Sequence, residues 1–179
     1  MAERRARPLD AEGLWQYALR ALSGRAHSIG ELREKLRRRA ERGEDVEDIL
    51  ARLKQSGYLD DKRYAESYAT SRLSGERFGP TRVVRDLRQH RVAPELAERT
   101  VEKVYQDVDE AALIEEWVRR KYRTATREGL FQDEKDMGAA YRRLVRAGFG
   151  TSAILKVLRR FAKNPDLLDG FEPPEEESD

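Results

Sequence analysis

The sequence of 179 residues has no cysteine, only two histidines and no long apolar run. Without cysteine the chain can form neither a disulfide nor a thiolate zinc site. No stretch approaches the roughly 18 to 20 apolar residues that a membrane-spanning helix needs. Residues 1–8, MAERRARP, lack the apolar core of a signal peptide. We therefore expect a cytoplasmic protein with no membrane partner.

The chemical groups that an enzyme brings together are missing as well. The sequence shows no glycine-rich phosphate loop, no His/Asp cluster with metal-ligand spacing and no nucleophile motif. His27 precedes a helix cap, where packing is its expected role. The adjacent acids Asp60 and Asp61 suggest a helix cap and a first-turn acid on the helix dipole, rather than a catalytic or metal-binding dyad. We expect no enzymatic activity, no cofactor and no metal.

Charge is abundant and unevenly distributed. Charged residues make up 39 % of the chain, and the formal net charge is +2. Residues 166–179 contain seven acids and no base, so removing their −7 leaves +9 on residues 1–165. Most of the bases are arginines, which suit bidentate contacts with phosphate, although a GC-rich genome would also raise their number. A basic body favours nucleic acid or a nucleoprotein as partner, and we expect the acidic tail to be disordered.

Apolar residues recur with helical spacing and no alternating strand pattern occurs, so the sequence predicts an all-α fold. Shifts of 51 and then 57 residues superpose the apolar positions. We therefore predict three tandem three-helix repeats stacked into an elongated, curved array, because a lone unit of this size has little core. The predicted segments are a basic extension (1–9), the repeats (10–58, 59–108 and 109–164) and the acidic tail (165–179).

Local signals predict where the helices begin and end. Ser28 and Glu31 form a capping box for the second helix, which we expect to stop near Gly43. Gly57 suits the left-handed residue after the third helix, and Asn164-Pro165 should end the last one. Trp15 and Trp117 lie in helical seams and are expected in the core. The predicted cap positions are Asp10, Ser28, Asp60, Gly79 and Asp136, and the third set of helices is expected to begin near Asp109.

The placement of arginine differs among the repeats. In repeat one, Arg38 and Arg42 share a face with Glu31, Glu34 and Glu41, which predicts a solvated face with cancelling charges. The middle helices of repeats two and three show arginines without acids on the outer face. Such arginines suit an anionic partner, although a solvated face with Arg82 tied to a neighbouring carboxylate would also explain them. The candidate filament- or nucleic-acid-binding residues are Arg77, Arg82, Arg85, Arg88, Arg142, Arg143 and Arg146.

Residues 57–65, Gly-Tyr-Leu-Asp-Asp-Lys-Arg-Tyr-Ala, with Arg72 and Gly79-x-x-Arg82, resemble the RecX family of bacterial regulators of the RecA recombinase. Residues 143–150, RLVRAGFG, resemble the third repeat of that family, so the match spans roughly residues 12–163. The chain departs from the family where a glycine usually closes the middle helix of repeat two, because it has residues 89–92, QHRV, there. The motif residues, which we expect to form a rigid corner between helices, are Gly57, Tyr58, Leu59, Asp60, Asp61, Arg63, Tyr64, Arg72 and Gly79.

The resemblance implies a monomeric regulator in DNA repair and the SOS response. It would lodge along the groove of the RecA–DNA filament and inhibit recombinase, ATPase and co-protease activity, with weaker, non-specific binding to single- or double-stranded DNA. An independent helix-turn-helix-like DNA-binding protein is the alternative, although nearly pure arginine stripes favour shape and charge over base readout. A third alternative is a protein-only scaffold whose arginines serve acidic partner surfaces.

Overall fold

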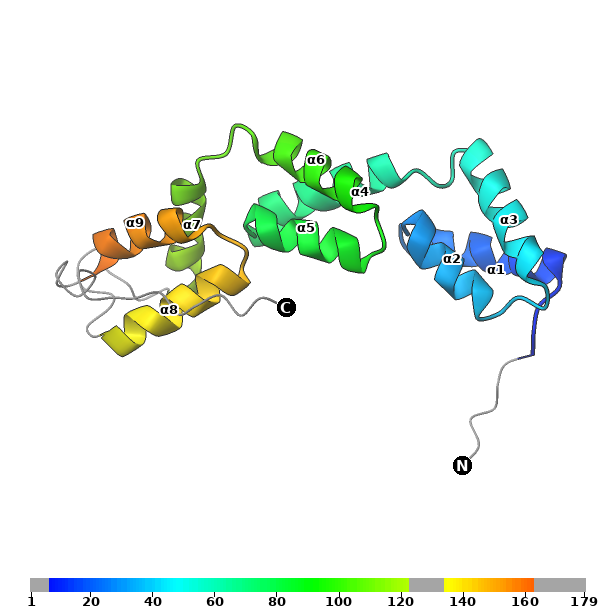
Figure 1. Ribbon diagram of the computed structural model, residues 1–179, viewed down its shortest axis with the longest axis horizontal. Coiled ribbons are helices and arrows are strands. Elements are labelled where there is room, and N and C mark those ends of the chain that lie inside the picture. The colour runs from blue at the N-terminus through cyan, green and yellow to red at the C-terminus, as the bar shows by residue number, and fades with distance from the viewer. Residues whose placement is uncertain (1–6, 123–133, 163–179) are drawn as a thin grey trace, which may run out of the picture. The chain divides into compact units, whose positions relative to one another are not determined.

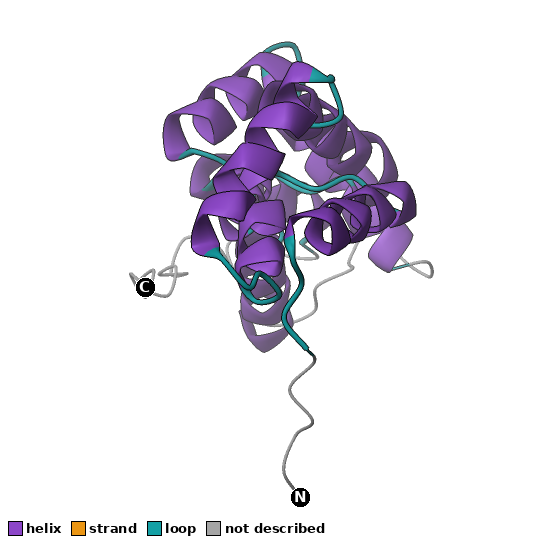
Figure 2. Cartoon of the chain, turned by 90° about the vertical axis from the view of Figure 1, so that its right-hand side faces the viewer, coloured by secondary structure: helices purple, strands orange, loops and turns teal. Residues whose placement is uncertain are grey.

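The computed structural model describes residues 7–122 and 134–162, and in this part of the chain the regular elements are helices without a strand (Figure 2). They follow one another as three sets of three, which confirms the predicted all-α repeat fold (Figure 1). The bounds are α1 Ala11–Gly24, α2 Ile29–Arg37, α3 Gly43–Gln55, α4 Asp61–Ser71, a π-helical turn η1 Arg72–Glu76, α5 Pro80–Gln89, α6 Pro94–Tyr105, α7 Glu110–Lys121, α8 Glu134–Arg146 and α9 Thr151–Phe161.

Three of the predicted caps are confirmed by hydrogen bonds to the free backbone N–H groups of a first turn. Asp10 Oδ1 accepts from Gly13 N at 2.9 Å, and Ser28 Oγ accepts from Glu31 N at 3.0 Å. Asp60 Oδ1 accepts from the backbone at the start of α4. Asp109, which was not predicted as a cap, does the same at the start of α7. These helix starts are therefore encoded locally.

Two predicted boundaries are wrong. The α2 helix ends at Arg37, and Gly43 begins α3 instead of stopping α2. The backbone that follows α2 pairs with Leu9, which donates to Arg39 O at 2.7 Å and accepts from Glu41 N at 2.9 Å, so the helix does not continue. Acids in the first turn of α3 then favour a helix start at Gly43. Asp136 lies inside the first turn of α8 rather than before it.

Contacts divide the chain into two units, each of which is described by itself. Unit one comprises residues 1–69 and 84–101, and unit two comprises residues 70–83 and 102–179, so the second repeat contributes to both. The core of repeat one, in unit one, consists of Leu14, Ala18, Leu32, Leu36, Val46, Ile49, Leu50, Leu53 and Leu59. In unit two the fully buried core includes Ile114, Val118, Met137, Leu144, Ile154, Val157 and Leu158.

The two tryptophans are only partly buried and pack at the margins of these cores. The guanidinium carbon of Arg52 lies over the Trp15 ring, 4.2 Å from its centre. Trp117 borders a pocket in unit two. No described helix is long and apolar enough to cross a bilayer. The predicted tail, the extra residues of repeat three and Asn164-Pro165 lie outside the described residues.

Candidate nucleic-acid interface

The motif of residues 57–65 forms the predicted corner of unit one. Gly57 ends the turn after α3 with a φ of 72°, a left-handed conformation in which a side chain would be strained. Leu59 is buried in the core of repeat one, and Asp60 caps α4. Tyr58 and Arg63 are different, because both are exposed and Tyr58 keeps 61 % of its surface accessible. The corner does not use these two side chains for packing.

Asp61 has a role that its position in the sequence does not reveal. Its Oδ1 accepts a hydrogen bond of 2.7 Å from Ile29 N, so it satisfies the start of α2, a helix of the preceding repeat. Burial raises the pKa of Asp61, while the bond from Ile29 N acts in the opposite direction. The prediction of a simple first-turn acid therefore missed a contact that joins two repeats.

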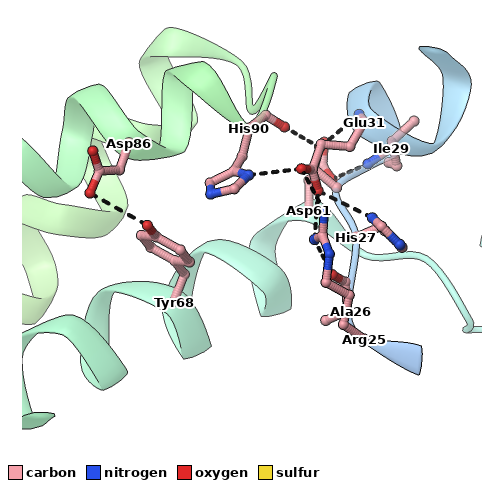
Figure 3. Close-up of polar contacts among 10 residues, drawn as sticks. Arg25, Ala26, His27, Ile29, Glu31, Asp61, Tyr68, Asp86 and His90 are labelled. Atoms are coloured by element: carbon pink, nitrogen blue, oxygen red, sulfur yellow. Dashed lines mark hydrogen bonds and ion pairs between the residues drawn. The ribbon is translucent and has the colours of Figure 1, made fainter. Parts of the chain in front are cut away.

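Glu31 lies at the centre of this junction (Figure 3). Its carboxylate accepts from both terminal nitrogens of Arg25 at 3.1 and 3.0 Å, contacts His90 Nδ1 at 2.8 Å, and lies 3.3 Å from His27 Nδ1. Burial opposes the charged form of Glu31, but the hydrogen bonds from Arg25 and His90 outweigh it and lower its pKa to about 2. The expectation that Glu31 belongs to a solvated face is wrong, because only 15 % of its side chain is exposed.

Aromatic rings of α4 complete the junction. The rings of Tyr64 and Tyr68 stack with centroids 6.2 Å apart, and His90 meets both of them edge-on. Burial and the charge of Glu31 raise the pKa of Tyr64 to about 12, so it stays neutral. The Tyr68 hydroxyl also lies 3.4 Å from Asp86 Oδ2 on α5. These contacts hold α4, α5 and the start of α2 as one structure.

In unit two, the segment between α4 and α5 is held by backbone and ionic contacts. Arg72 pairs with Glu76 inside η1, and Arg77 adopts a left-handed φ of 55° while its guanidinium pairs with Glu116 at 2.6 Å. Arg120 of α7 donates to the carbonyls of residues 75 and 76 at 2.8 and 2.6 Å. Arg77, a predicted binding residue, is thus engaged in an ion pair.

Gly79, at the start of α5, lies directly against the turn that ends α8. Gly79 N donates to Ala147 O at 2.8 Å, and a Cβ on Gly79 would lie 2.2 Å from Gly148 O. Gly148 has a φ of 90°, and a Cβ there would meet Arg82 N at 2.3 Å. Both glycines are required by this close backbone approach.

Next to this contact, unit two contains a basic pocket of about 340 Å³, which we call the Arg143 pocket. Arg82 lies over the ring of Phe78 at 3.7 Å, and Arg143 donates to the Tyr122 hydroxyl at 3.0 Å. Among the described residues no acid lines the pocket. Its lining residues are Phe78, Arg82, Trp117, Lys121, Arg143, Arg146 and Ala147.

Four cations beside a partly exposed aromatic side chain suit a nucleic-acid strand. Guanidinium and ammonium groups bind backbone phosphates, and an aromatic side chain provides a platform for a base. Sequence reasoning identified the three arginines but assigned Trp117 to the core and missed Lys121. The two are spaced i to i+4 on α7, so the signal was an aromatic and a basic residue one turn apart on a single face.

The predicted arginine stripes are only partly unpaired. Arg88 pairs with Glu98 of α6, so the premise that no acid reaches this face is wrong at that position. Arg85 is exposed on α5, and Arg142 and Arg146 are exposed one turn apart on α8. Within the described residues, none of these three makes an ion pair. In repeat one, the predicted pair of Arg38 with Glu34 is present at 3.3 Å.

Comparison with known proteins gives consistent matches. Family models match at residues 15–53, described as the first three-helix domain of RecX, and at residues 60–101, described as the second. The chain is 32 % identical over 149 residues to the regulatory protein RecX of Herminiimonas arsenicoxydans. This alignment covers 83 % of this chain and 93 % of that protein. It is 33 % identical over 152 residues to the RecX of Deinococcus radiodurans, covering 85 % and 70 %.

Solved structures support the fold. The crystal structure of RecX from Lactobacillus salivarius superposes with a TM-score of 0.64 at 20 % sequence identity, and covers 84 % of this chain and 96 % of that chain. A second crystal structure, of a regulatory protein RecX, gives a TM-score of 0.62 at 21 % identity, with coverage of 83 % and 73 %.

Proposed function

Since the chain belongs to the RecX family of regulatory proteins, we propose that it binds the RecA–DNA filament and inhibits the recombinase, ATPase and co-protease activities of RecA. The proposal extends what the family resemblance implies to this chain. It requires a surface that accepts nucleic-acid phosphates and a surface that contacts protein.

The Arg143 pocket is the observation that carries the nucleic-acid part. It brings together Lys121, Arg143 and Arg146 with Arg82, no acid of the described residues lines it, and Trp117 adds a ring. Phosphate contacts of this kind depend on charge and shape, not on base sequence. A regulator that must bind filaments on any DNA sequence needs this type of contact.

Tyr58 and Arg63 supply a candidate protein contact in unit one. Exposed tyrosine and arginine are over-represented where proteins bind one another, because each combines apolar area with hydrogen bonding. Both residues belong to the family motif, and neither side chain is used in packing. We propose that they contact RecA while the Arg143 pocket contacts DNA. Inhibition then follows from occupation of the filament, without covalent chemistry by this chain.

Independent DNA binding is the second candidate, and the same pocket supports it. A base-reading helix exposes side chains such as asparagine or glutamine beside arginine. Among the residues that the structure describes, neither type lines the Arg143 pocket. Binding to bare DNA should therefore be insensitive to sequence, and weaker than binding to the filament if RecA contributes contacts.

The experiment titrates the protein into a RecA ATPase assay on single-stranded DNA. We expect wild-type protein to inhibit at or below one molecule per RecA. Arg146→Gln should need about tenfold more protein, since a charge-assisted hydrogen bond contributes about 1.5 kcal/mol or more. The matched control is Arg119→Gln on α7, because Arg119 already pairs with Glu115 at 3.2 Å.

Two results would contradict the proposal. An ATPase rate unchanged by wild-type protein on its cognate filament would refute the assignment to RecA. Equal losses for Arg146→Gln and Arg119→Gln would show that only net charge matters, and would refute the Arg143 pocket as the contact.

The double variant Tyr58→Ala, Arg63→Ala tests the proposed contact with RecA. It should weaken inhibition while leaving affinity for bare DNA unchanged.

A further inference from the structure

Unit one has a second basic pocket, in a repeat where no candidate binding residue was predicted. It measures about 490 Å³ and opens between α1 and the end of α2. We call it the Arg39 pocket. Its lining residues are Tyr17, Arg20, Ala21, Lys35 and Arg39.

The chain holds Arg39 at this position through its backbone. Arg39 N donates to Leu36 O at 2.9 Å, and Arg39 O accepts from Leu9 N at 2.7 Å. The guanidinium carbon lies 5.3 Å from the centre of the Tyr17 ring, a cation–π contact that orients the side chain. Arg20 lies one turn after Tyr17 on α1, and its Nε donates to Gln16 O at 3.3 Å, which leaves its terminal nitrogens for another acceptor.

The cations of the Arg39 pocket have no carboxylate beside them among the described residues, whereas the nearby arginines on α2 and after it form ion pairs. Arg33 and Arg37 pair with Glu47 at 3.0 and 3.3 Å, and Arg38 pairs with Glu34. By contrast, no carboxylate of the described residues lines this pocket. Among these arginines only Arg38 belongs to the solvated face that the sequence predicted, and the pocket is a separate feature.

The Arg39 pocket carries an electrostatic cost that an anion would relieve. Arg39 Nε is buried and finds no hydrogen-bond acceptor within the described residues. A buried donor without an acceptor is costly, and so is the approach of like charges. The carbonyl end of α2 stabilises cations such as Lys35, but it does not supply an acceptor to Arg39 Nε. An anion in the pocket would neutralise the three cations, and the terminal nitrogens of Arg20 and Arg39 would donate to it.

The arrangement favours phosphate over the other anionic or aromatic groups of a partner. Arg39 covers one face of Tyr17, so a base cannot stack there. A planar carboxylate is matched by a single guanidinium fork. Here the cations come from α1, α2 and the turn after α2, an arrangement that suits a tetrahedral group. We propose that the Arg39 pocket binds a backbone phosphate of DNA, and that repeat one is a second DNA-contacting part of the chain.

Binding to a fluorescent oligothymidylate, measured by anisotropy at several salt concentrations, tests this inference without RecA. Lys35→Gln and Arg39→Gln should each weaken binding about tenfold at low salt and reduce the salt slope by about 0.7, the value for one phosphate of a single strand. The matched control, Arg37→Gln, removes the same charge from the same helix but a residue paired with Glu47. It should change affinity less than twofold.

A second measurement reads the site directly. In the ¹⁵N-resolved NMR spectrum, the Nε–H resonance of Arg39 should shift when inorganic phosphate is added, and Lys35→Gln should reduce that shift. Lys35→Gln leaves the contact between Arg39 and Tyr17 in place, so it tests the site even if Arg39→Gln perturbs folding.

Three results would overturn the inference: equal losses for Lys35→Gln and Arg37→Gln, an unchanged affinity in all three variants, or equally strong competition by a polyglutamate peptide of the same length. Since RecA is absent from these measurements, their failure would leave the proposed regulatory function untouched.

Discussion

Replacing Glu31 with glutamine should weaken the junction of unit one, because a single, partly buried carboxylate there holds residues from two repeats. Its partners are Arg25 and His27, which precede α2, and His90, which follows α5. Glutamine keeps the size of the side chain but removes its charge and one acceptor. The substitution therefore tests the electrostatic contribution of Glu31 with little change in packing.

The magnitude follows from the pKa of Glu31. Its fall from the ordinary value of 4.5 to about 2 is a difference of about 2.5, which corresponds to an upper limit of about 3 kcal/mol. Arg25 is half exposed, so solvent screens part of this interaction. We expect Glu31→Gln to lower the free energy of unfolding by about 1 to 2 kcal/mol at pH 7.

The pH dependence has a definite sign. A carboxyl group whose pKa is lowered by folding stabilises the protein above pH 4.5, and this contribution is lost as the pH falls towards about 2. The difference between wild type and Glu31→Gln should therefore be constant above pH 5 and less than half as large at pH 3. Burial lowers the pKa of His27, so stability also falls below pH 6.5 through that residue, in a separate pH range.

Urea unfolding followed by far-ultraviolet circular dichroism, at pH 7 and pH 3, measures both effects. Glu47→Gln is the control, since Glu47 also accepts from two arginines but is half exposed, and we expect a change within about 0.5 kcal/mol. Equal changes for the two variants at pH 7 would refute the special role of Glu31. A difference between wild type and Glu31→Gln that persists undiminished at pH 3 would refute the electrostatic explanation.

Three further predictions concern the backbone contacts and the tail. Gly79→Ala should destabilise the protein by about 3 kcal/mol or more in a thermal melt, because its Cβ would lie 2.2 Å from Gly148 O. Gly75→Ala, whose Cβ would meet no described atom within 4 Å, should stay within about 1 kcal/mol, and equal effects would exclude the steric explanation. Arg91→Gly should raise stability by about 0.5 kcal/mol in urea, since it relieves a φ of 59° and loses only a long, exposed ion pair with Glu34; a clear loss would show that the side chain packs favourably. Truncation after Pro165 removes −7 and should tighten binding to bare DNA at low salt; equal affinity of both forms would show that the tail does not compete.

The features that could be predicted from the sequence are those that depend on nearby residues. The caps Asp10, Ser28 and Asp60 are signals three residues long, and Gly57 was predicted from the end of one helical pattern. Apolar periodicity predicted the helices because the apolar residues that form the buried face of a helix recur within the sequence of that helix alone. The error at Gly43 has a non-local cause. Leu9, about 30 residues before the turn, forms backbone hydrogen bonds with Arg39 and Glu41, so α2 ends earlier than its own sequence predicts.

The features that sequence reasoning missed depend on residues distant in sequence. Asp61 bonds to a backbone N–H 32 positions earlier, and His90 reaches a carboxylate 59 positions earlier. A helical-face analysis of one repeat cannot find such partners. The same limit explains Arg88, whose acidic partner comes from the next helix, and Lys121, which enters the Arg143 pocket from α7.

The departure of this chain from the family at residues 89–92 has a structural explanation in the junctions themselves. In unit one the Ser28 side chain bonds to His90 O, and in unit two Gly79 N bonds to Ala147 O. These contacts are equivalent, because the shift of 51 carries Ser28 to Gly79 and the shift of 57 carries His90 to Ala147.

In each junction, the start of the middle helix of one repeat lies against a left-handed residue. That residue follows the middle helix of the next repeat. In unit two that residue is Gly148, and Gly79 faces it; in unit one it is Arg91, and Gly30 faces it, with a would-be Cβ only 2.5 Å from Arg91 Cβ. The space that a glycine at position 91 would provide is thus supplied by Gly30 on the opposite helix. The close approach requires a glycine on at least one of the two facing helices. Because Gly30 supplies it here, the arginine at position 91 is compatible with the fold of the repeat.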